Sequence, residues 1–359
     1  MNLNKLPRIL FLAPGAVALI AGLLAGLDRM DIALPIPTID LAMKHGPLMV
    51  AGFLATVIGL ERAVALQSGW AFLAPAFSGI GALLFLAGFS QAPILMALGG
   101  LVLALSGLEG VRRQPALYSV IMALGGMAGA AATVFWAFGA SVPDAVGSWM
   151  AFLALTIAGE RLELTRFLPP AKGRTPSLIL LIALILLGSA TSLIDSNAAP
   201  RVMGAGFLGL AVWLMVFDIA RRNLRQPGLP RFIGLALLLG YVWLGIGGGA
   251  LIDHGMPQGG FEYDAVLHLI FVGFVFSMIF GHAPVILPAV LKVQTPYHPI
   301  LMVWLALLHG GLLLRLIGDH NAIVALRQWG GVLNEAAIIL LIVTLAFRTI
   351  RAKRRPQST

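Results

Sequence analysis

Twelve apolar stretches, each close to the length that a helix needs to cross a bilayer, follow one another along almost the whole chain. They lie at about 9–27, 46–66, 70–89, 92–108, 117–140, 146–167, 177–195, 202–220, 232–252, 265–291, 299–317 and 328–347. A crossing helix needs about 20 apolar residues, and lipid offers no partners for backbone N–H and C=O groups, so each stretch is expected to be helical. The sequence therefore predicts an all-α, polytopic membrane protein with about 12 transmembrane helices.

The composition excludes an ordinary soluble globule. Hydrophobic residues make up 59% of the 359 residues, charged residues make up 11%, and the mean hydropathy is +0.94. The chain has no cysteine, which excludes disulfides, thiolate metal sites, iron–sulfur ligation and covalent c-type heme attachment. Any bound metal must therefore be held by His, Met or carboxylate side chains, or by a porphyrin.

The distribution of charge predicts how the chain is oriented in the membrane. Basic residues gather at both termini and after even-numbered stretches: Lys5, Arg8, Arg112, Arg113, Lys172, Arg174, Arg221, Arg222, Arg225, Arg231, Lys292, Arg351, Lys353, Arg354 and Arg355. Acidic residues gather in the odd-numbered connections: Asp31, Asp40, Asp144, Asp195, Asp253, Glu262, Asp264 and Asp319. Because Lys and Arg mark the cytoplasmic side, we expect a multi-pass protein with both termini cytoplasmic. The net charge of +9 then reflects orientation in the bilayer and argues against a nucleic-acid partner.

Three of the stretches carry a shared sequence mark, in which a polar side chain follows a Gly-Phe or Ala-Phe pair. The polar residue comes nine positions after the first residue of the pair: Glu61 after Gly52-Phe53, Glu160 after Ala151-Phe152 and His282 after Gly273-Phe274. This recurrence predicts a pseudo-threefold arrangement of four-helix repeats, at about 1–110, 111–225 and 226–347. We expect these repeats to form a single membrane domain over 1–359, with a basic cytoplasmic tail at 348–359. Glu61 and Glu160 should then lie at equivalent depths.

Two histidines are candidate ligands of a heme iron. His45 opens the second stretch and His268 lies just inside the tenth, so both are predicted near the outer face at similar depth. Two neutral imidazoles from facing helices are what axial ligation requires, and small residues such as Gly46, Gly52 and Gly273 would leave space for a flat macrocycle. The alternative is structural: His45 is solvated by lipid headgroups and His268 bonds a backbone carbonyl.

A second pair of histidines could hold another metal. His282 lies in the tenth stretch and His309 in the eleventh, and a short connection predicts that these two helices are antiparallel neighbours. A buried pair of imidazoles could bind copper, iron or a proton. The alternative is that His309 bonds a hydroxyl or a carbonyl, and His298 is expected in a loop.

Charged pairs follow two of the marks. Glu61-Arg62 and Glu160-Arg161 are spaced for local ion pairs near the cytoplasmic face, which is the favoured interpretation. The functional alternative is a proton path or a clamp for heme propionates.

The chain resembles a known family at the first pair of histidines. His45-Gly46-Pro47-Leu48-Met49 matches the His-Gly-x-x-Met context of a heme ligand in the second helix of heme–copper oxidase subunit I, and His268 stands where the tenth helix carries the opposing ligand. The size, span count and tenth stretch, GFVFSMIFGHA, resemble the smaller NnrS-type membrane proteins. This resemblance implies a location in a bacterial inner membrane, heme b, copper as a second cofactor, and a role in nitric oxide or nitrosative stress. The electron donor is unknown.

The chain departs from the oxidases at their oxygen-reducing centre. It has no histidine between His45 and His254, and the histidines of its tenth stretch are far apart. An oxygen-reducing binuclear centre is therefore not expected. Two other classes of function stay open: a proton-coupled secondary transporter using Glu61, Glu160 and His282, and a non-catalytic membrane assembly or quinone-interacting subunit. A threefold repeat favours neither, since transporters more often show twofold inverted repeats.

Overall fold

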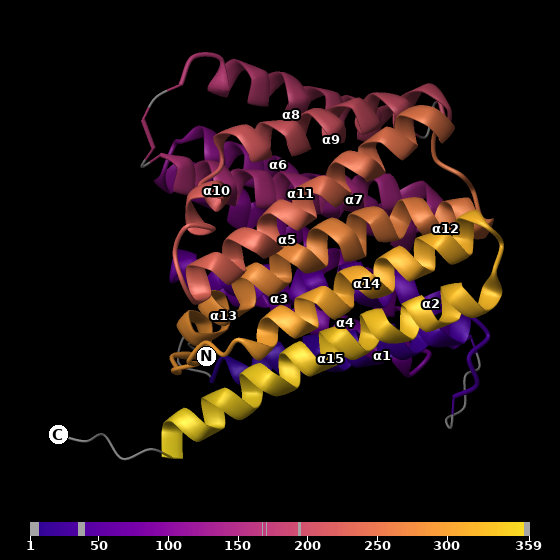
Figure 1. Cartoon of the computed structure of the whole chain (residues 1–359), viewed down its shortest axis with the longest axis horizontal. Helices are drawn as coiled ribbons and strands as arrows, with labels where there is room; N and C mark the ends of the chain where they lie inside the picture. The colour runs from indigo at the N-terminus through magenta and orange to yellow at the C-terminus, as the bar shows by residue number, and fades with distance from the viewer. Residues whose placement is uncertain (1–6, 35–39, 167, 170, 193–194, 355–359) are drawn as a thin grey trace. The chain divides into compact units, whose positions relative to one another are not determined.

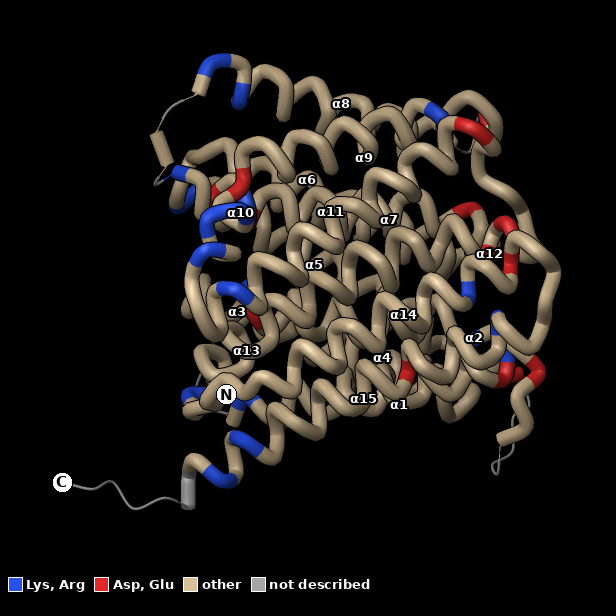
Figure 2. The backbone as a smooth tube through the Cα atoms, in the orientation of Figure 1, with Lys and Arg blue, Asp and Glu red and all other residues tan. Residues whose placement is uncertain are grey.

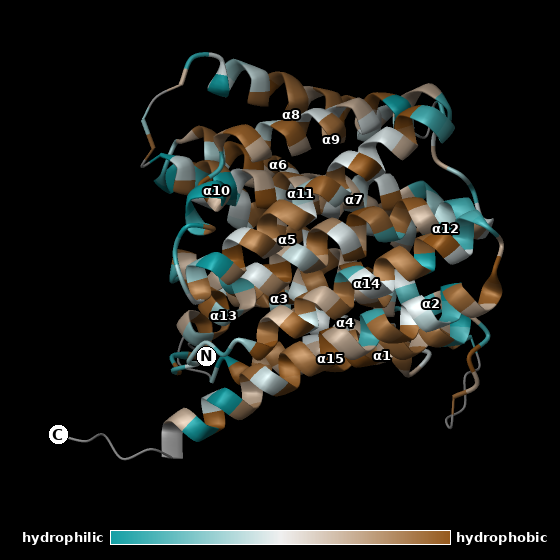
Figure 3. Ribbon diagram, in the orientation of Figure 1, coloured by the Kyte–Doolittle hydropathy of each residue, from teal (hydrophilic) through white to brown (hydrophobic). Residues whose placement is uncertain are grey.

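The protein is an all-helical, multi-pass membrane protein. A computed structural model describes residues 7–34, 40–166, 168–169, 171–192 and 195–354, and this described part contains no strand (Figure 1). Within it, twelve helices are long and apolar enough to cross a membrane, one for each predicted stretch. Figure 3 shows hydrophobic residues along the helices and hydrophilic ones at their ends. The prediction of an all-α, polytopic protein with about 12 spans is confirmed.

The helices begin and end close to the predicted boundaries. Ten spans are formed by α1 (Ile9–Arg29), α4 (Leu73–Leu86, after the short 3₁₀ turn η3, Gly69–Phe72), α5 (Ala92–Arg113), α6 (Leu117–Ala137), α7 (Val142–Thr165), α8 (Arg174–Thr191), α9 (Ala198–Phe217), α11 (Leu229–His254), α14 (Ile300–His320) and α15 (Val324–Arg354). The second span joins α2 (Leu41–Pro47), η2 (Leu48–Leu54) and α3 (Ala55–Leu66). The tenth joins α12 (Gly260–His268), η4 (Leu269–Phe276) and α13 (Ser277–Leu291), and a short helix α10 (Ala220–Asn223) precedes α11.

Two boundary predictions change. The second span begins at Leu41, so His45 lies one turn inside the helix rather than at its opening. The predicted basic tail is partly helical, because α15 continues to Arg354 and its apolar span reaches Ala352. Residues 355–359, with Arg355, and the basic residue Lys5 lie outside the described residues.

The helices form two compact units. The first comprises residues 1–163 and 179–203, and the second comprises 164–178 and 204–359. In the first unit α5 packs between α4 and α6, and α1 packs on η2 and α4. In the second unit α14 and α15 lie side by side, and α11 packs along η4 and α13 (Figure 1). These boundaries differ from those of the three predicted repeats, which stay a prediction.

The three spans that carry the shared mark are the most buried. Between 61% and 78% of their apolar windows is buried, against 28–50% in the others. In two of the three, the mark itself lies in a π-helical segment: Gly52-Phe53 in η2 and Gly273-Phe274 in η4. Single π-helical turns inside α-helices occur frequently at functional sites. The sequence mark therefore identifies inner helices and, twice, an irregular backbone.

A side-chain hydroxyl bonds to the backbone just after each of these π-helical segments. Just after η2, the Thr56 hydroxyl donates to the carbonyl of Gly52 at 2.5 Å, and just after η4, the Ser277 hydroxyl donates to the carbonyl of Gly273. A widened turn weakens the usual backbone bond, and a hydroxyl four residues on can satisfy the carbonyl instead. The same hydrogen bond from a hydroxyl to a backbone carbonyl is therefore present in two spans that are far apart in the sequence.

Candidate functional site

The ring of His45 is held by a backbone carbonyl of the first helix. Its Nδ1 lies 2.7 Å from the carbonyl oxygen of Gly22 in α1. Because a carbonyl only accepts, Nδ1 carries the proton in this tautomer and the lone pair is on Nε2. His45 is partly buried and lies one turn before η2.

His268 is held in the same manner. Its Nδ1 lies 2.7 Å from the carbonyl oxygen of Asp264, one turn earlier in α12, and 3.5 Å from Oδ1 of the same residue. The lone pair is again on Nε2, and η4 begins at the next residue. The expected bond from His268 to a backbone carbonyl is thus present, and it is compatible with ligation through Nε2. Histidines that bind metals usually donate their other ring N–H to a carbonyl or carboxylate in this way.

The two histidines belong to different units. His45 lies in the first and His268 in the second, and each environment is described by itself. Their ligation of one iron therefore stays a prediction from the sequence.

The glycines of the predicted heme site serve helix packing within each unit. A Cβ on Gly52 would lie 3.0 Å from the side chain of Ala82, and one on Gly273 would lie 2.6 Å from Trp243. A Cβ on Gly46 would lie 3.3 Å from Val142. Neighbouring helices approach closely at these positions, as small residues allow in membrane proteins. The interpretation that the glycines open space for a macrocycle is not supported by these contacts.

A cluster of charged side chains, the charge knot, holds the helix turn that carries His268. Its members are Asp264, Arg315, Asp319 and Arg327. Arg315 of α14 donates two hydrogen bonds to Asp264, at 2.7 and 2.8 Å, and both side chains are less than a tenth exposed. Arg327 of α15 lies 3.4 Å from Asp264 and 3.0 Å from Asp319. Figure 2 shows acidic and basic positions together around α12. Asp264 and Asp319, which the sequence placed in connections, are helix residues that join α12, α14 and α15.

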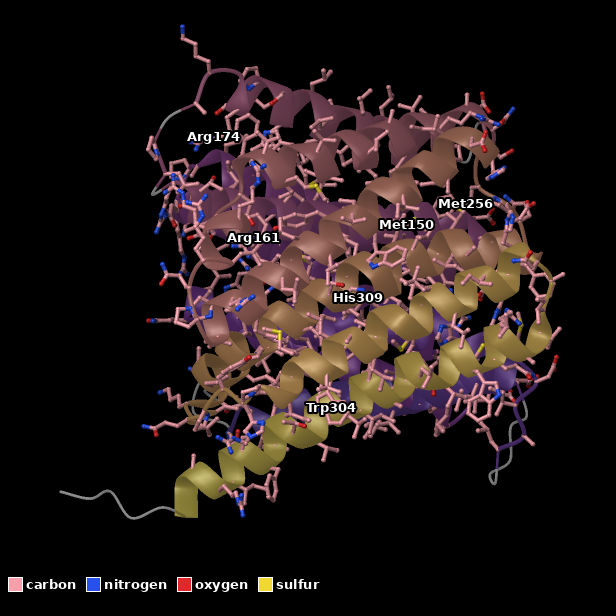
Figure 4. The ribbon with its side chains drawn as sticks, viewed as in Figure 1. Met150, Arg161, Arg174, Met256, Trp304 and His309 are labelled. Atoms are coloured by element: carbon pink, nitrogen blue, oxygen red, sulfur yellow. The ribbon has the colours of Figure 1, made fainter. Side chains whose placement is uncertain are left out.

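His309 makes a different kind of contact from the first two histidines. It lies near the middle of α14 (Figure 4), and its Nδ1 accepts a hydrogen bond of 2.8 Å from the indole Nε1 of Trp243 in α11. The proton of its ring is therefore on Nε2. A metal on Nε2 would require Nδ1 to be protonated, which conflicts with the Trp243 donor. The geometry favours the hydrogen-bonding interpretation, and a metal pair with His282 stays a prediction.

The charged pairs after the first two marks meet at one guanidinium. Arg62 Nη2 lies 2.8 Å from Glu160 and 3.3 Å from Glu61, two carboxylates that are 99 positions apart in the chain. The prediction that Glu61 and Glu160 lie at equivalent depths is confirmed, and so is the local pair Glu61–Arg62. Arg161, the neighbour of Glu160, is buried, and Glu160 accepts a hydrogen bond of 2.8 Å from Arg62. Because one guanidinium pairs with both carboxylates, the structure supports the ion-pair interpretation of these residues over a proton path.

Replacing Arg62 with methionine should destabilise the first unit. The change removes the shared cation and leaves two partly buried carboxylates close together, so we expect a loss of about 1–3 kcal/mol, between exposed and buried ion pairs. Unfolding in mixed micelles measures this loss. The double change Arg62→Met with Glu160→Gln should recover part of it, because one carboxylate charge is removed with the cation. Equal stability of the single variant and the wild type would contradict the bridging role.

Several charged or polar residues of the second unit were missed by the sequence interpretation. The charged residues Arg315, Arg327 and Glu335 and the polar residue Asn334 lie inside the last two spans. Charged groups in an apolar run are expensive and usually paired, so Arg315 in LLLRLIGD and Glu335 in LNEAA were signals that could have been used. The partner of Arg315 could not have been found by spacing, because Asp264 is 51 positions away.

The first unit contains a small cavity beside η2. Its volume is about 10 Å³, and it is lined by small and aromatic residues including Ala51, Gly126, Thr133, Trp149 and Phe152. This space is about that of one water molecule, and it is far too small for a macrocycle.

Comparison with known proteins gives one family. A family model described as Domain of unknown function (DUF8744) matches residues 8–350. No curated protein matches the chain.

Proposed function

The chain belongs to the family described as Domain of unknown function (DUF8744), and from its own side chains we propose that it is a heme-binding protein of a bacterial inner membrane. The proposal rests on a hydrogen-bond arrangement that two histidines share. In both His45 and His268, Nδ1 is bonded to a carbonyl at 2.7 Å and the lone pair is on Nε2. A π-helical segment begins three residues after His45 and directly after His268. Orientation by a carbonyl bond is typical of imidazole ligands to metals.

The roles of the residues follow from this state. His45 and His268 supply the two imidazole ligands, and the Asp264–Arg315 pair holds the turn of α12 that carries His268. When bound, a heme with two imidazole ligands supplies one-electron redox chemistry. The absence of cysteine favours heme b. The resemblance to NnrS-type proteins supports a role in nitric oxide or nitrosative stress, with copper as a second cofactor.

The orientation in the membrane is part of the proposal. In the second unit, basic residues lie in α10, just before α11 begins, and at the C-terminal end of α15. Asp253 and Asp319 lie in the last turns of α11 and α14, and Glu262 lies in the first turn of α12. These acidic residues mark the opposite end of the helices. By the positive-inside rule the basic ends are cytoplasmic, so His45 and His268 lie in the outer half of the bilayer.

The heme content of purified variants tests the proposal. We expect His45→Ala and His268→Ala each to lose most of the heme that the wild type retains, because each removes one axial ligand. His254→Ala is the matched control, since this histidine is 54% exposed beside Asp253 at the end of α11. Heme per polypeptide, measured after extraction into alkaline pyridine, gives the comparison. Wild-type heme in both variants would contradict the assignment, and loss in only one would contradict a shared iron.

A further inference from the structure

Buried polar atoms without a hydrogen-bond partner are concentrated between α14 and α15. Among the described residues, they include both carboxylate oxygens of Asp319, Nε of Arg327, Oδ1 of Asn334 and Nε2 of His309. Asp319, Asn334 and His309 are each less than a tenth exposed. Arg327 Nε lies 3.0 Å from Asp319, but the two groups are too poorly aligned to form a hydrogen bond.

These groups extend from one end of the second unit to its middle. Asp319 is in the last turn of α14, and His309 is ten residues deeper in the same helix, a rise of about 15 Å. On α15, Arg327 lies in the first turn and Asn334 is seven residues deeper, or about 10 Å. The groups at the end of α14 belong to the charge knot, because Arg327 contacts both Asp319 and Asp264, and Asp264 binds Arg315.

The backbones of α14 and α15 approach each other closely along the seam between the two helices. A Cβ on Gly318 would lie 2.4 Å from the backbone nitrogen of Arg327, and one on Gly330 would lie 2.4 Å from that of Arg315. Asn334 Nδ2 donates to the carbonyl of Leu308 at 2.6 Å. Its Oδ1 is thereby held at the seam, where no side chain of the described structure donates to it.

An unsatisfied buried polar atom destabilises the folded protein, and lipid cannot supply the missing partners. Proteins satisfy such groups with internal waters, which usually make about three hydrogen bonds each. The set is mixed, because Asp319 and Asn334 accept whereas Arg327 and His309 donate. A cation would be repelled by Arg327, and an anion by Asp319. Water both donates and accepts, so it fits the whole set.

We propose that internal waters bind the unsatisfied polar groups of α14 and α15 at two levels of the second unit. One group of waters lies at Asp319 and Arg327 near the end of α14, and the other lies at Asn334 and His309 in the middle of the unit, where it hydrates a buried histidine. This proposal does not rest on heme, because none of its groups is a proposed ligand.

Radiolytic hydroxyl-radical labelling tests the proposal, because radicals formed from an internal water oxidise the side chains beside it. Trp243 contacts His309 and is the reporter. Trp213 of α9, in the same unit, is the matched control, since it is also buried and its Nε1 donates to the carbonyl of Arg174 at 2.8 Å. We expect oxidation of His309 and Trp243 severalfold above that of Trp213 in the purified full chain. Oxidation no greater than that of Trp213 would overturn the proposal.

Two variants sharpen the test. Asn334→Leu replaces the buried acceptor with an apolar side chain, and it should lower oxidation of His309 and Trp243 toward the level of Trp213. Asn321→Leu alters an exposed residue at the end of α14 and should leave the pattern unchanged. If Asn334→Leu fails to fold, the comparison between Trp243 and Trp213 in the wild type decides alone. An unchanged pattern in a folded Asn334→Leu variant would contradict the binding of water at Asn334.

Discussion

Replacing Arg315 with methionine is expected to lower the free energy of unfolding by about 3–5 kcal/mol, the usual cost of leaving one partner of a buried ion pair alone. The Arg315 and Asp264 side chains are 8% and 6% exposed, and two hydrogen bonds join them. Without Arg315, the remaining cation near Asp264 is Arg327 at 3.4 Å. Equilibrium unfolding in mixed micelles measures the change.

Removal of both charges provides the control for Arg315→Met. The double change Asp264→Asn with Arg315→Met should be more stable than the single variant, because an apolar or neutral replacement of a whole buried pair is often tolerated. Arg112→Met is the surface control, because Arg112 is 76% exposed and its ion pair with Glu109 should contribute little. Equal losses at Arg112 and Arg315 would show that the charge knot does not stabilise the fold.

Two adjacent glycines of α11 should respond in opposite directions to alanine. A Cβ on Gly248 would lie 2.6 Å from the backbone nitrogen of Leu208 and 2.7 Å from the carbonyl oxygen of Gly204, so α9 would have to move. We expect Gly248→Ala to cost about 1–3 kcal/mol, as overpacking usually does. A Cβ on Gly249 would meet nothing within 4 Å. Gly249→Ala should therefore be neutral or stabilising by up to about 1 kcal/mol, since alanine is the better helix former.

The same unfolding assay compares the two glycine variants with the wild type. The two glycines share a helix and receive the same substitution, so differences in membrane insertion or expression are minimised. Destabilisation of Gly249→Ala as large as that of Gly248→Ala would contradict the close approach of α9 and α11 at Gly204.

The helices could be predicted from the sequence because the signal is local. An apolar run of about 20 residues has few alternatives to a membrane-spanning helix. The equal depth of Glu61 and Glu160 was also predictable, because both follow the same Phe-containing mark by the same number of residues. The bridging role of Arg62 needed the structure, since its adjacent carboxylate alone suggested a local pair.

The residues of the second unit illustrate what local patterns miss. Asp264 was placed in a connection, at the entry of the tenth stretch, yet it is buried and binds an arginine that is 51 positions away in the sequence. Gly52 and Gly273 were interpreted as space for a cofactor, whereas they accommodate neighbouring helices. A small residue allows close approach of a ligand and of a helix equally well, and spacing does not distinguish the two.

The reduced-minus-oxidised visible spectrum of the purified wild-type protein, with iron analysis, tests the central claim most directly. The proposal predicts the spectrum of a low-spin b-type heme and one iron bound through His45 and His268. A colourless protein without iron, obtained from cells supplied with heme, would contradict it.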